Sequence, residues 1–282
     1  MTDKIIYEER YASHPKDVSS YSTEKLREEF LVEQIFEADK IRLTYSLYDR
    51  FILGGVAPVN EMLQLDTIPP LKSKNFCDRR EIGVINIGGP GVVSVDGEEI
   101  SLDNKEALYI GKGIKIIIFK SKDKKNPALF YMNSTPAHQS FPTKKISLKE
   151  AVILELGTAK EANERRIIKY IVEQTVATCQ LQMGITELKP GSVWNSIPPH
   201  THNRRMEVYF YTNLPENQAI CHFMGQGTDT RHIWLSNNQA VISPSWSIHC
   251  GVGTSNYIFI WGMAGENLDF TDMDVISVKD LR

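Results

Sequence analysis

The sequence lacks any long hydrophobic run and any excess of charge of one sign. Its longest apolar stretches, such as 114–119 and 257–261, are far shorter than the roughly 20 residues that a membrane-spanning helix needs. The 282 residues include 32 Lys and Arg against 35 Asp and Glu, which gives a net charge of −3 with both signs interspersed. We therefore expect neither a membrane nor a nucleic acid as a partner.

Cysteine is also scarce. The four cysteines, Cys77, Cys179, Cys221 and Cys250, are separated by at least 29 residues, which excludes a zinc-knuckle or a redox Cys-x-x-Cys spacing. The first residues are polar and mixed in charge, without the apolar segment that is typical of a secretion signal. We expect a cytoplasmic protein with reduced thiols.

Helical periodicity is limited to one early segment, 23–36, where Leu26, Phe30 and Ile35 recur at helical spacing and Thr23 is a candidate N-cap. Most of the remaining chain consists of short segments rich in β-branched and aromatic residues, separated by Gly, Asp-Gly or Pro. These segments are 41–53, 83–87, 91–102, 106–119, 128–133, 167–172, 178–188, 206–213, 217–225, 239–244 and 257–263. Many short strands at close spacing predict an all-β sandwich or barrel.

The two halves of the chain resemble each other. Residues 78–87 match 203–212 at an offset of 125, and 100–116 match 233–249 at an offset of 133. Internal duplication is the simplest explanation. The polar, Pro-containing stretch 134–151 is typical of a linker, so we predict two domains, 1–145 and 146–282.

Candidate metal ligands lie in the second half. His200 and His202 stand at i and i+2, so both imidazoles leave the same face of an extended chain. Glu207 follows His202 by five residues, an odd offset that would place it on the opposite face of one unbroken strand. It joins the histidines only if residues 203–205 turn or bulge. His249 follows a later Pro-Ser turn. Three imidazoles and one carboxylate suit Zn²⁺, Fe²⁺, Mn²⁺ or Ni²⁺, and the ligands alone do not choose among these metals.

A His-x-His-x4-Glu pattern with a distant His, on a duplicated all-β chain, resembles the cupin family. That resemblance implies two tandem cupin (double-stranded β-helix) barrels, here with a short N-terminal helix. Longer stretches are similar to the 5-keto-4-deoxyuronate isomerase family, and this likeness covers nearly the whole chain. They are 49–55, 178–195, 204–211, 239–254, 259–267 and 279–282.

The second resemblance implies a homohexameric ketol-isomerase that converts 4-deoxy-5-ketouronate into 3-deoxy-2,5-diketogluconate during pectin breakdown. It also implies one Zn²⁺ per chain on the ligands His200, His202, Glu207 and His249. On ligand grounds alone, two alternatives stay open. One is a cupin dioxygenase with iron on the same residues, and the other is a non-enzymatic sugar-binding bicupin.

A uronate carboxylate needs a cation, preferably a guanidinium. Arg204 and Arg205 flank the ligands, and we predict that one of them contacts the carboxylate; Arg165, Arg166 and Arg231 are the other candidates. Gln180 and Gln182 stand on a polar strand face that suits sugar hydroxyls. The acid or base stays open among four residues: Tyr209, Tyr211, His222 and His232.

The first repeat is expected to be free of metal. Aligning the repeats places other residues at the positions of the four ligands: Asn75, Cys77, Ile82 and Ile116. Only Cys77 could ligate, and an isolated thiolate makes a poor site. We therefore predict an apolar interior in the first domain and one metal per chain.

Overall fold

The computed structural model describes residues 4–266, 268–269 and 271–282, and the chain forms two compact units. Unit 1 comprises Gln34–Val152, Tyr170–Met183 and the described residues up to Arg10. Unit 2 comprises Tyr11–Glu33, Ile153–Lys169 and the described residues from Gly184 on. The units exchange segments along the chain, so the division into 1–145 and 146–282 stays a proposal.

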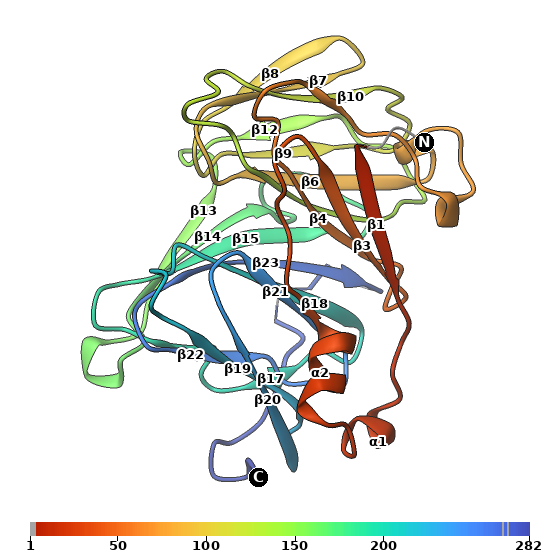
Figure 1. The fold of residues 1–282 in the computed structure, drawn as a ribbon. Helices are drawn as coiled ribbons and strands as arrows, with labels where there is room; N and C mark the ends of the chain where they lie inside the picture. Colours follow the sequence, from red (N-terminus) through yellow and green to blue (C-terminus); the bar gives the residue numbers. More distant parts are fainter. Residues whose placement is uncertain (1–3, 267, 270) are drawn as a thin grey trace. The chain divides into compact units, whose positions relative to one another are not determined.

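Unit 1 contains two sheets (Figure 1). The larger sheet has the order β1 (Ile5–Arg10), β3 (Ile41–Ser46), β4 (Ile52–Val56), β11 (Phe130–Pro136), β6 (Arg80–Asn86), β9 (Ala107–Ile110) and β12 (Lys144–Ile146). The smaller sheet has the order β5 (Leu63–Gln64), β10 (Ile117–Ser121), β7 (Gly91–Val95) and β8 (Glu98–Leu102). Ile82 and Val84 of β6 share one buried apolar core with Val93 of β7 and Phe119 of β10, so the sheets form a sandwich.

A second pair of sheets is built mainly from unit 2 (Figure 1). Its larger sheet has the order β13 (Val152–Leu156), β14 (Arg165–Ile171), β15 (Gln182–Leu188), β23 (Ile258–Gly265), β18 (Arg205–Thr212), β21 (Gln239–Ser243) and β2 (Leu31–Val32). Its smaller sheet has the order β16 (Trp194–Asn195), β22 (Cys250–Gly253), β19 (Ile220–Gln226) and β20 (Asp229–Leu235). A short ladder joins β17 (His200–Thr201) to β24 (Asp274–Val275).

The two pairs of sheets repeat one topology. In the larger sheets, the order β3-β4-β11-β6-β9 corresponds to β14-β15-β23-β18-β21, so β6 and β18 occupy equivalent places. This agrees with the sequence offset of 125, which aligns Ile82 of β6 with Glu207 of β18. The prediction of a duplicated all-β chain with a short N-terminal helix is confirmed.

Helices are few. They are α1 (Pro15–Val18), α2 (Thr23–Phe30) and the 3₁₀ turns Pro69–Leu71, Phe76–Asp78 and Ala159–Glu161. The helix expected over 23–36 is shorter, and its N-cap is Ser22, whose side chain accepts a hydrogen bond from the amide of Lys25. It ends at Phe30 because the next residues, Leu31–Val32, pair with β21 as β2.

Several expected strands are divided by turns. The segment 41–53 contains β3 and the start of β4, and Asp49 and Arg50 adopt left-handed conformations between them with φ of 47° and 51°. The Asp96-Gly97 turn likewise separates β7 from β8. Other strands were not predicted: β1, β5, β13, β16, β17, β20, β22 and β24. The expected linker 134–151 contains β12 and the end of β11.

A buried carboxylate organises one corner of unit 1. Oε1 of Glu81 accepts hydrogen bonds from the amides of Gln180 and Leu181, both at 2.9 Å. Oε2 accepts from the amide of Cys179 and the hydroxyl of Tyr109, both at 2.8 Å. The hydroxyl of Thr135 is a fifth donor, at 3.3 Å from Oε1. The three amides on the fully buried Glu81 hold the segment 179–181 in place.

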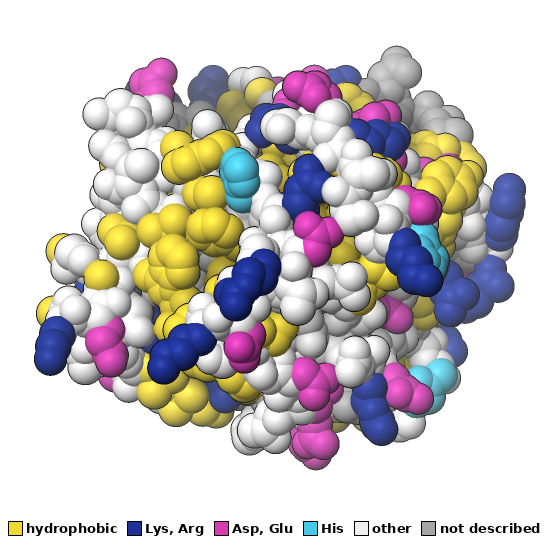
Figure 2. Space-filling model, turned by 90° about the horizontal axis from the view of Figure 1, so that it is seen from below, with side chains coloured by type: hydrophobic (Ala, Val, Ile, Leu, Met, Phe, Trp, Pro, Cys, Tyr) yellow, Lys and Arg dark blue, Asp and Glu magenta, His cyan; other side chains and the backbone are white. Residues whose placement is uncertain are grey.

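Among the described residues, no helix is long and apolar enough to cross a membrane. The face shown in Figure 2 carries charged side chains of both signs, interspersed, beside an area where hydrophobic side chains gather. No single-sign field is visible on that face, which agrees with the charge balance of the sequence.

Candidate metal centre

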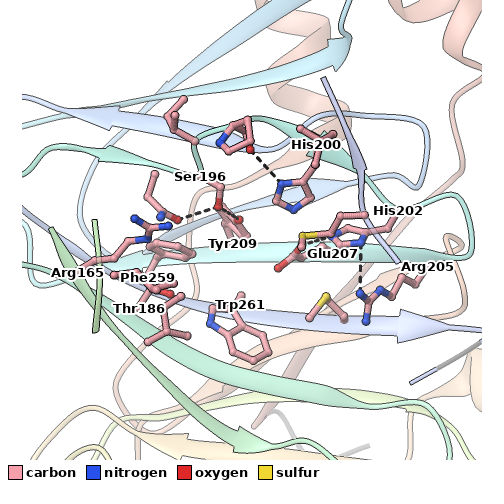
Figure 3. A pocket seen from close by; sticks show the side chains of 18 residues that line it. Arg165, Thr186, Ser196, His200, His202, Arg205, Glu207, Tyr209, Phe259 and Trp261 are labelled. Atoms are coloured by element: carbon pink, nitrogen blue, oxygen red, sulfur yellow. Dashed lines mark hydrogen bonds and ion pairs between the residues drawn. The ribbon is translucent and has the colours of Figure 1, made fainter. Parts of the chain in front are cut away.

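A cavity of about 280 Å³ lies in unit 2 against one face of the larger sheet (Figure 3). That volume is close to the lower end of the roughly 300–1,000 Å³ of small-molecule sites, so the cavity suits a small ligand. Strands β14, β15, β18 and β23 supply half of its lining. The lining residues are Leu156, Arg165, Ile167, Thr186, Asn195, Ser196, Ile197, Pro198, His200, His202, Arg205, Glu207, Tyr209, Phe259, Trp261, Met263, Met273 and Val275.

Four potential metal ligands converge on this cavity. The chain turns at residues 203–204, between β17 and β18, as the odd offset of Glu207 required. Glu207 therefore lies on the same side as His200 and His202, and His249 joins them from the residue before β22. One ligand atom from each of the four residues lies within 4.8 Å of all the others, and the group could hold a metal ion.

The outer nitrogens of the three imidazoles all lie near acceptor oxygens. Nδ1 of His200 is 3.3 Å from the carbonyl oxygen of Pro198, Nδ1 of His249 is 3.4 Å from that of Ser247, and Nδ1 of His202 is 3.5 Å from Oδ1 of Asp272. A proton on Nδ1 leaves the lone pair on Nε2. Such acceptors fix the tautomer of metal-binding histidines.

The inner nitrogens face one another and the carboxylate. Nε2 of His200 lies 3.1 Å from Nε2 of His249, and Oε2 of Glu207 lies 2.8 Å from the same His249 nitrogen. Nε2 of His202 is 3.3 Å from Oε2 of Glu207. Lone pairs that converge at these distances repel unless a cation lies among them, so the donor set fits a bound metal.

The pKa shifts of His200 and Glu207 agree with ligation. Burial lowers the pKa of His200 to about 3, with a further contribution from His249. Burial alone would raise the pKa of Glu207, but the imidazoles of His249 and His202 hold it below its usual range. Neutral imidazoles and an ionised carboxylate are the forms that bind metals.

Arg205 and Asp272 support His202. Nη2 of the buried Arg205 donates to Oδ1 of Asp272 at 2.5 Å. The same Nη2 is 3.3 Å from Nδ1 of His202, but the bond to Asp272 is much shorter. Asp272 therefore accepts from Arg205 and neutralises its charge, and the same carboxylate oxygen lies 3.5 Å from Nδ1 of His202.

The other residues predicted to contact a substrate lie elsewhere. Arg204 is exposed, with Nε 3.7 Å from Glu266, and it does not line the cavity. Gln180 donates to the carbonyl oxygen of Pro136 at 2.7 Å in unit 1, and Gln182 is buried in β15 outside the lining. Of these four predictions, the structure brings only Arg205 to the cavity.

Among the four candidates for the acid or base, only Tyr209 lines the cavity. Its hydroxyl lies 3.1 Å from Oγ of Ser196. Tyr211 and His222 are buried and hydrogen-bonded to each other at 2.7 Å, and His232 is exposed on β20. Burial, with the charge of Glu207, raises the pKa of Tyr209 well above its usual value, so this hydroxyl keeps its proton.

Sequence reasoning missed Ser196, Asp272, Phe259 and Trp261. The two aromatic residues stand at alternate positions of β23, and period-two alternation could have identified their shared face. Asp272 and Ser196 carry no such signal, because each reaches the site from an irregular segment.

The equivalent place in unit 1 is apolar. Cys77 and Ile82, which align with His202 and Glu207, are fully buried in its core, and burial raises the pKa of the Cys77 thiol. Ile116, which aligns with His249, stands directly before β10 as His249 stands directly before the equivalent strand β22, but it is 47% exposed whereas His249 is buried. The metal content of this unit stays a prediction.

Comparison with known proteins gives both relatives and structural neighbours. The profile of the KduI/IolB family matches residues 61–278. A Formosa agariphila protein named 4-deoxy-L-threo-5-hexosulose-uronate ketol-isomerase is 58% identical over 98% of this chain and 99% of its own length. A Lachnoclostridium phytofermentans protein of the same name is 54% identical over 97% and 99%.

Solved structures show the same architecture at low identity. An IolB-like protein from Salmonella typhimurium has a TM-score of 0.69 at 13% identity, covering 88% of this chain and 96% of its own. An oxalate decarboxylase from Lactobacillus farciminis has a TM-score of 0.54 at 11% identity, covering 81% and 79%. The expected cupin fold is confirmed, with paired sheets in place of closed barrels.

Proposed function

The chain belongs to the KduI/IolB family, and from this we propose that it is a metal-dependent ketol-isomerase of 4-deoxy-L-threo-5-hexosulose uronate. One observation carries the proposal. Three Nε2 atoms and a carboxylate converge in a mostly apolar cavity. The relatives that share nearly the whole chain are named for this activity. Their names favour neither a dioxygenase nor a sugar-binding protein.

The proposed reaction needs no external oxidant. The C1 aldehyde becomes a primary alcohol while the C2 hydroxyl becomes a ketone, so one carbon is reduced as its neighbour is oxidised. The product is 3-deoxy-2,5-diketogluconate. Both an enediol route and a hydride shift require the oxygens of C1 and C2 to be held together. A divalent metal on His200, His202, Glu207 and His249 would act as a Lewis acid toward these oxygens.

The chain's own residues orient the substrate and exclude water. Tyr209, which keeps its proton, and Ser196 form a hydroxyl pair that can donate hydrogen bonds to a substrate oxygen. Phe259 and Trp261 supply apolar walls, which strengthen electrostatic interactions inside the cavity. Of the four residues predicted to contact the substrate, only Arg205 lines the cavity. We propose that Arg205 positions His202 through Asp272.

We also propose zinc as the metal, one ion per chain, because the donor set of imidazoles and a carboxylate suits it. A cytoplasmic location is proposed because all four cysteines are unpaired, as expected in a reducing compartment. A homohexamer is proposed because β13, at one end of its sheet, exposes Ile153 and Leu154, which a second copy could cover.

The decisive experiment assays purified protein with the unsaturated uronate released by pectate digestion, together with elemental analysis. We expect ketol-isomerase activity and close to one zinc per chain, with both retained in Cys77→Ala. Absence of turnover by the zinc-loaded protein would refute the activity. Two tightly held ions, with one lost in Cys77→Ala, would refute the stoichiometry. Light scattering tests the hexamer.

A further inference from the structure

The cavity contains a second guanidinium besides that of Arg205. Arg165 lies on β14, and it lines the cavity together with Ile167 two residues later. Because side chains alternate across a strand, the intervening Arg166 belongs to the other face, and it does not line the cavity. Figure 3 shows Arg165 beside Ser196 and Phe259, on the opposite side of the cavity from Arg205.

The two cavity arginines differ in their partners. Arg205 donates from Nη2 to the carboxylate of Asp272 at 2.5 Å, although its buried Nε and Nη1 have no hydrogen-bond partner among the described residues. Arg165 donates from Nη1 to the carbonyl oxygen of Asn163 at 3.0 Å, and its buried Nε likewise has no partner among those residues. Within the described part of the chain, no carboxylate lies within 4 Å of Arg165. Its charge is therefore uncompensated by the protein.

An uncompensated guanidinium is costly in an apolar cavity. Burial lowers the pKa of Arg165, but arginine keeps its charge in proteins. The neighbouring lining is largely apolar, including Ile167, Phe259 and Trp261. Arg165 is half-buried, and a partly buried charge without a counterion still costs free energy, which an anionic ligand would reduce. The planar guanidinium matches a carboxylate in particular.

We propose that Arg165 binds the carboxylate of the uronate substrate, an inference that rests on the proposed function. The open-chain substrate has its reacting carbons, C1 and C2, at one end and its carboxylate at the other. The cavity has its ligand cluster on one side and Arg165 on another, so each end of the substrate meets a suitable group. Arg165 thereby selects uronates over neutral sugars and directs C1 and C2 toward the ligand cluster.

Kinetics with the unsaturated uronate test the role of this charge. Arg165→Met should raise KM about tenfold to a hundredfold, since charge-assisted hydrogen bonds of typical strength are lost. Arg165→Lys should recover part of that loss. Arg166→Met is the matched control: its side chain is on the same strand, with Nε 3.9 Å from Glu155, and its KM should equal that of the wild type. Equal KM values for Arg165→Met and wild type would overturn the proposal.

A binding measurement separates this inference from the proposed activity. Thermal stabilisation of the zinc-loaded protein is measured with D-glucuronate and with D-glucose, which differ at C6. We expect glucuronate alone to stabilise the wild type and Arg166→Met, and stabilisation to be lost in Arg165→Met. If the wild type lacks isomerase activity but shows this pattern, the proposed function fails and the carboxylate site stands. If glucuronate does not stabilise the wild type, or stabilises Arg165→Met equally, the carboxylate site fails.

Discussion

Nε2 of His200 lies 3.1 Å from Nε2 of His249, while Nδ1 of each ring faces a main-chain carbonyl oxygen. If the Nδ1 protons point outward to these carbonyl oxygens, neither inner nitrogen carries a proton to share with the other. The fold then holds two lone pairs close together, and a cation bound between them would offset their repulsion. A metal in this place would therefore stabilise the folded unit as well as act in the proposed reaction.

His202→Ala should strip the metal and abolish isomerase activity while the β-rich circular dichroism spectrum is retained, because the variant removes one of four donors. Metal content, activity and the spectrum are measured on the same preparation. His232→Ala is the matched control, since that imidazole is exposed on β20, and it should keep both metal and activity. Full activity in a metal-free His202→Ala protein would contradict the assignment.

Asp272→Asn should weaken metal binding or activity by about tenfold to a hundredfold, the usual effect of losing an outer-shell carboxylate. The amide cannot balance the charge of Arg205, and its acceptor strength toward His202 is lower. Competition with a chromophoric chelator measures the affinity. Asp274→Asn is the control, because Asp274 accepts from Asn203 and does not line the cavity. Equal affinities in the two variants would exclude this role for Asp272.

The ligand set could be predicted because its information is local. The i, i+2 spacing predicted that His200 and His202 share one face of the chain. The odd offset of Glu207 from His202 predicted a turn between them, and the structure has that turn. The sequence did not show which of Arg204 and Arg205 faces the cavity. Adjacent residues on a strand face opposite sides, and the side that Arg205 takes is fixed by its hydrogen-bond partner. That partner, Asp272, is 67 residues away in sequence.

The limits of the fold prediction have the same origin. Most of the longer strands were identified, although β1 and β13 were missed despite their β-branched residues. Strand β2 was assigned to a helix because Leu31 continues the helical periodicity of α2. Pairing with β21 overrides that local preference. Arg165 was named among five arginines, but only the three-dimensional arrangement distinguishes it from its neighbour Arg166.

Tyr209→Phe should lower kcat by about tenfold to a hundredfold with little change in overall stability, since a hydrogen-bond donor to a substrate oxygen is lost. Steady-state kinetics with the unsaturated uronate measure the effect. Tyr211→Phe is the matched control: this tyrosine lies on the same strand and pairs with His222, outside the cavity lining. A kcat reduced equally in both variants would indicate a packing effect and not a role at the substrate.

Glu81→Gln should destabilise the protein by at least about 1.5–3 kcal/mol, because the carboxylate accepts five hydrogen bonds and the NH₂ group of glutamine would face some of the same donors. Urea unfolding followed by circular dichroism measures the loss. Glu99→Gln, on the exposed strand β8, should change stability by no more than about 0.5 kcal/mol. Equal unfolding midpoints for the two variants would show that Glu81 does not hold the segment 179–181.

The order in which the chain is synthesised matters for unit 2. Leu31 pairs with Val241, 210 residues later, and β21 also pairs with β18, which carries Glu207. Strand β2 is the first of this sheet to be synthesised, and it cannot pair until β21 has emerged from the ribosome. Closing a loop over such a separation slows folding. The sheet that carries Glu207 therefore receives its edge strand β2 only after β21 has been synthesised.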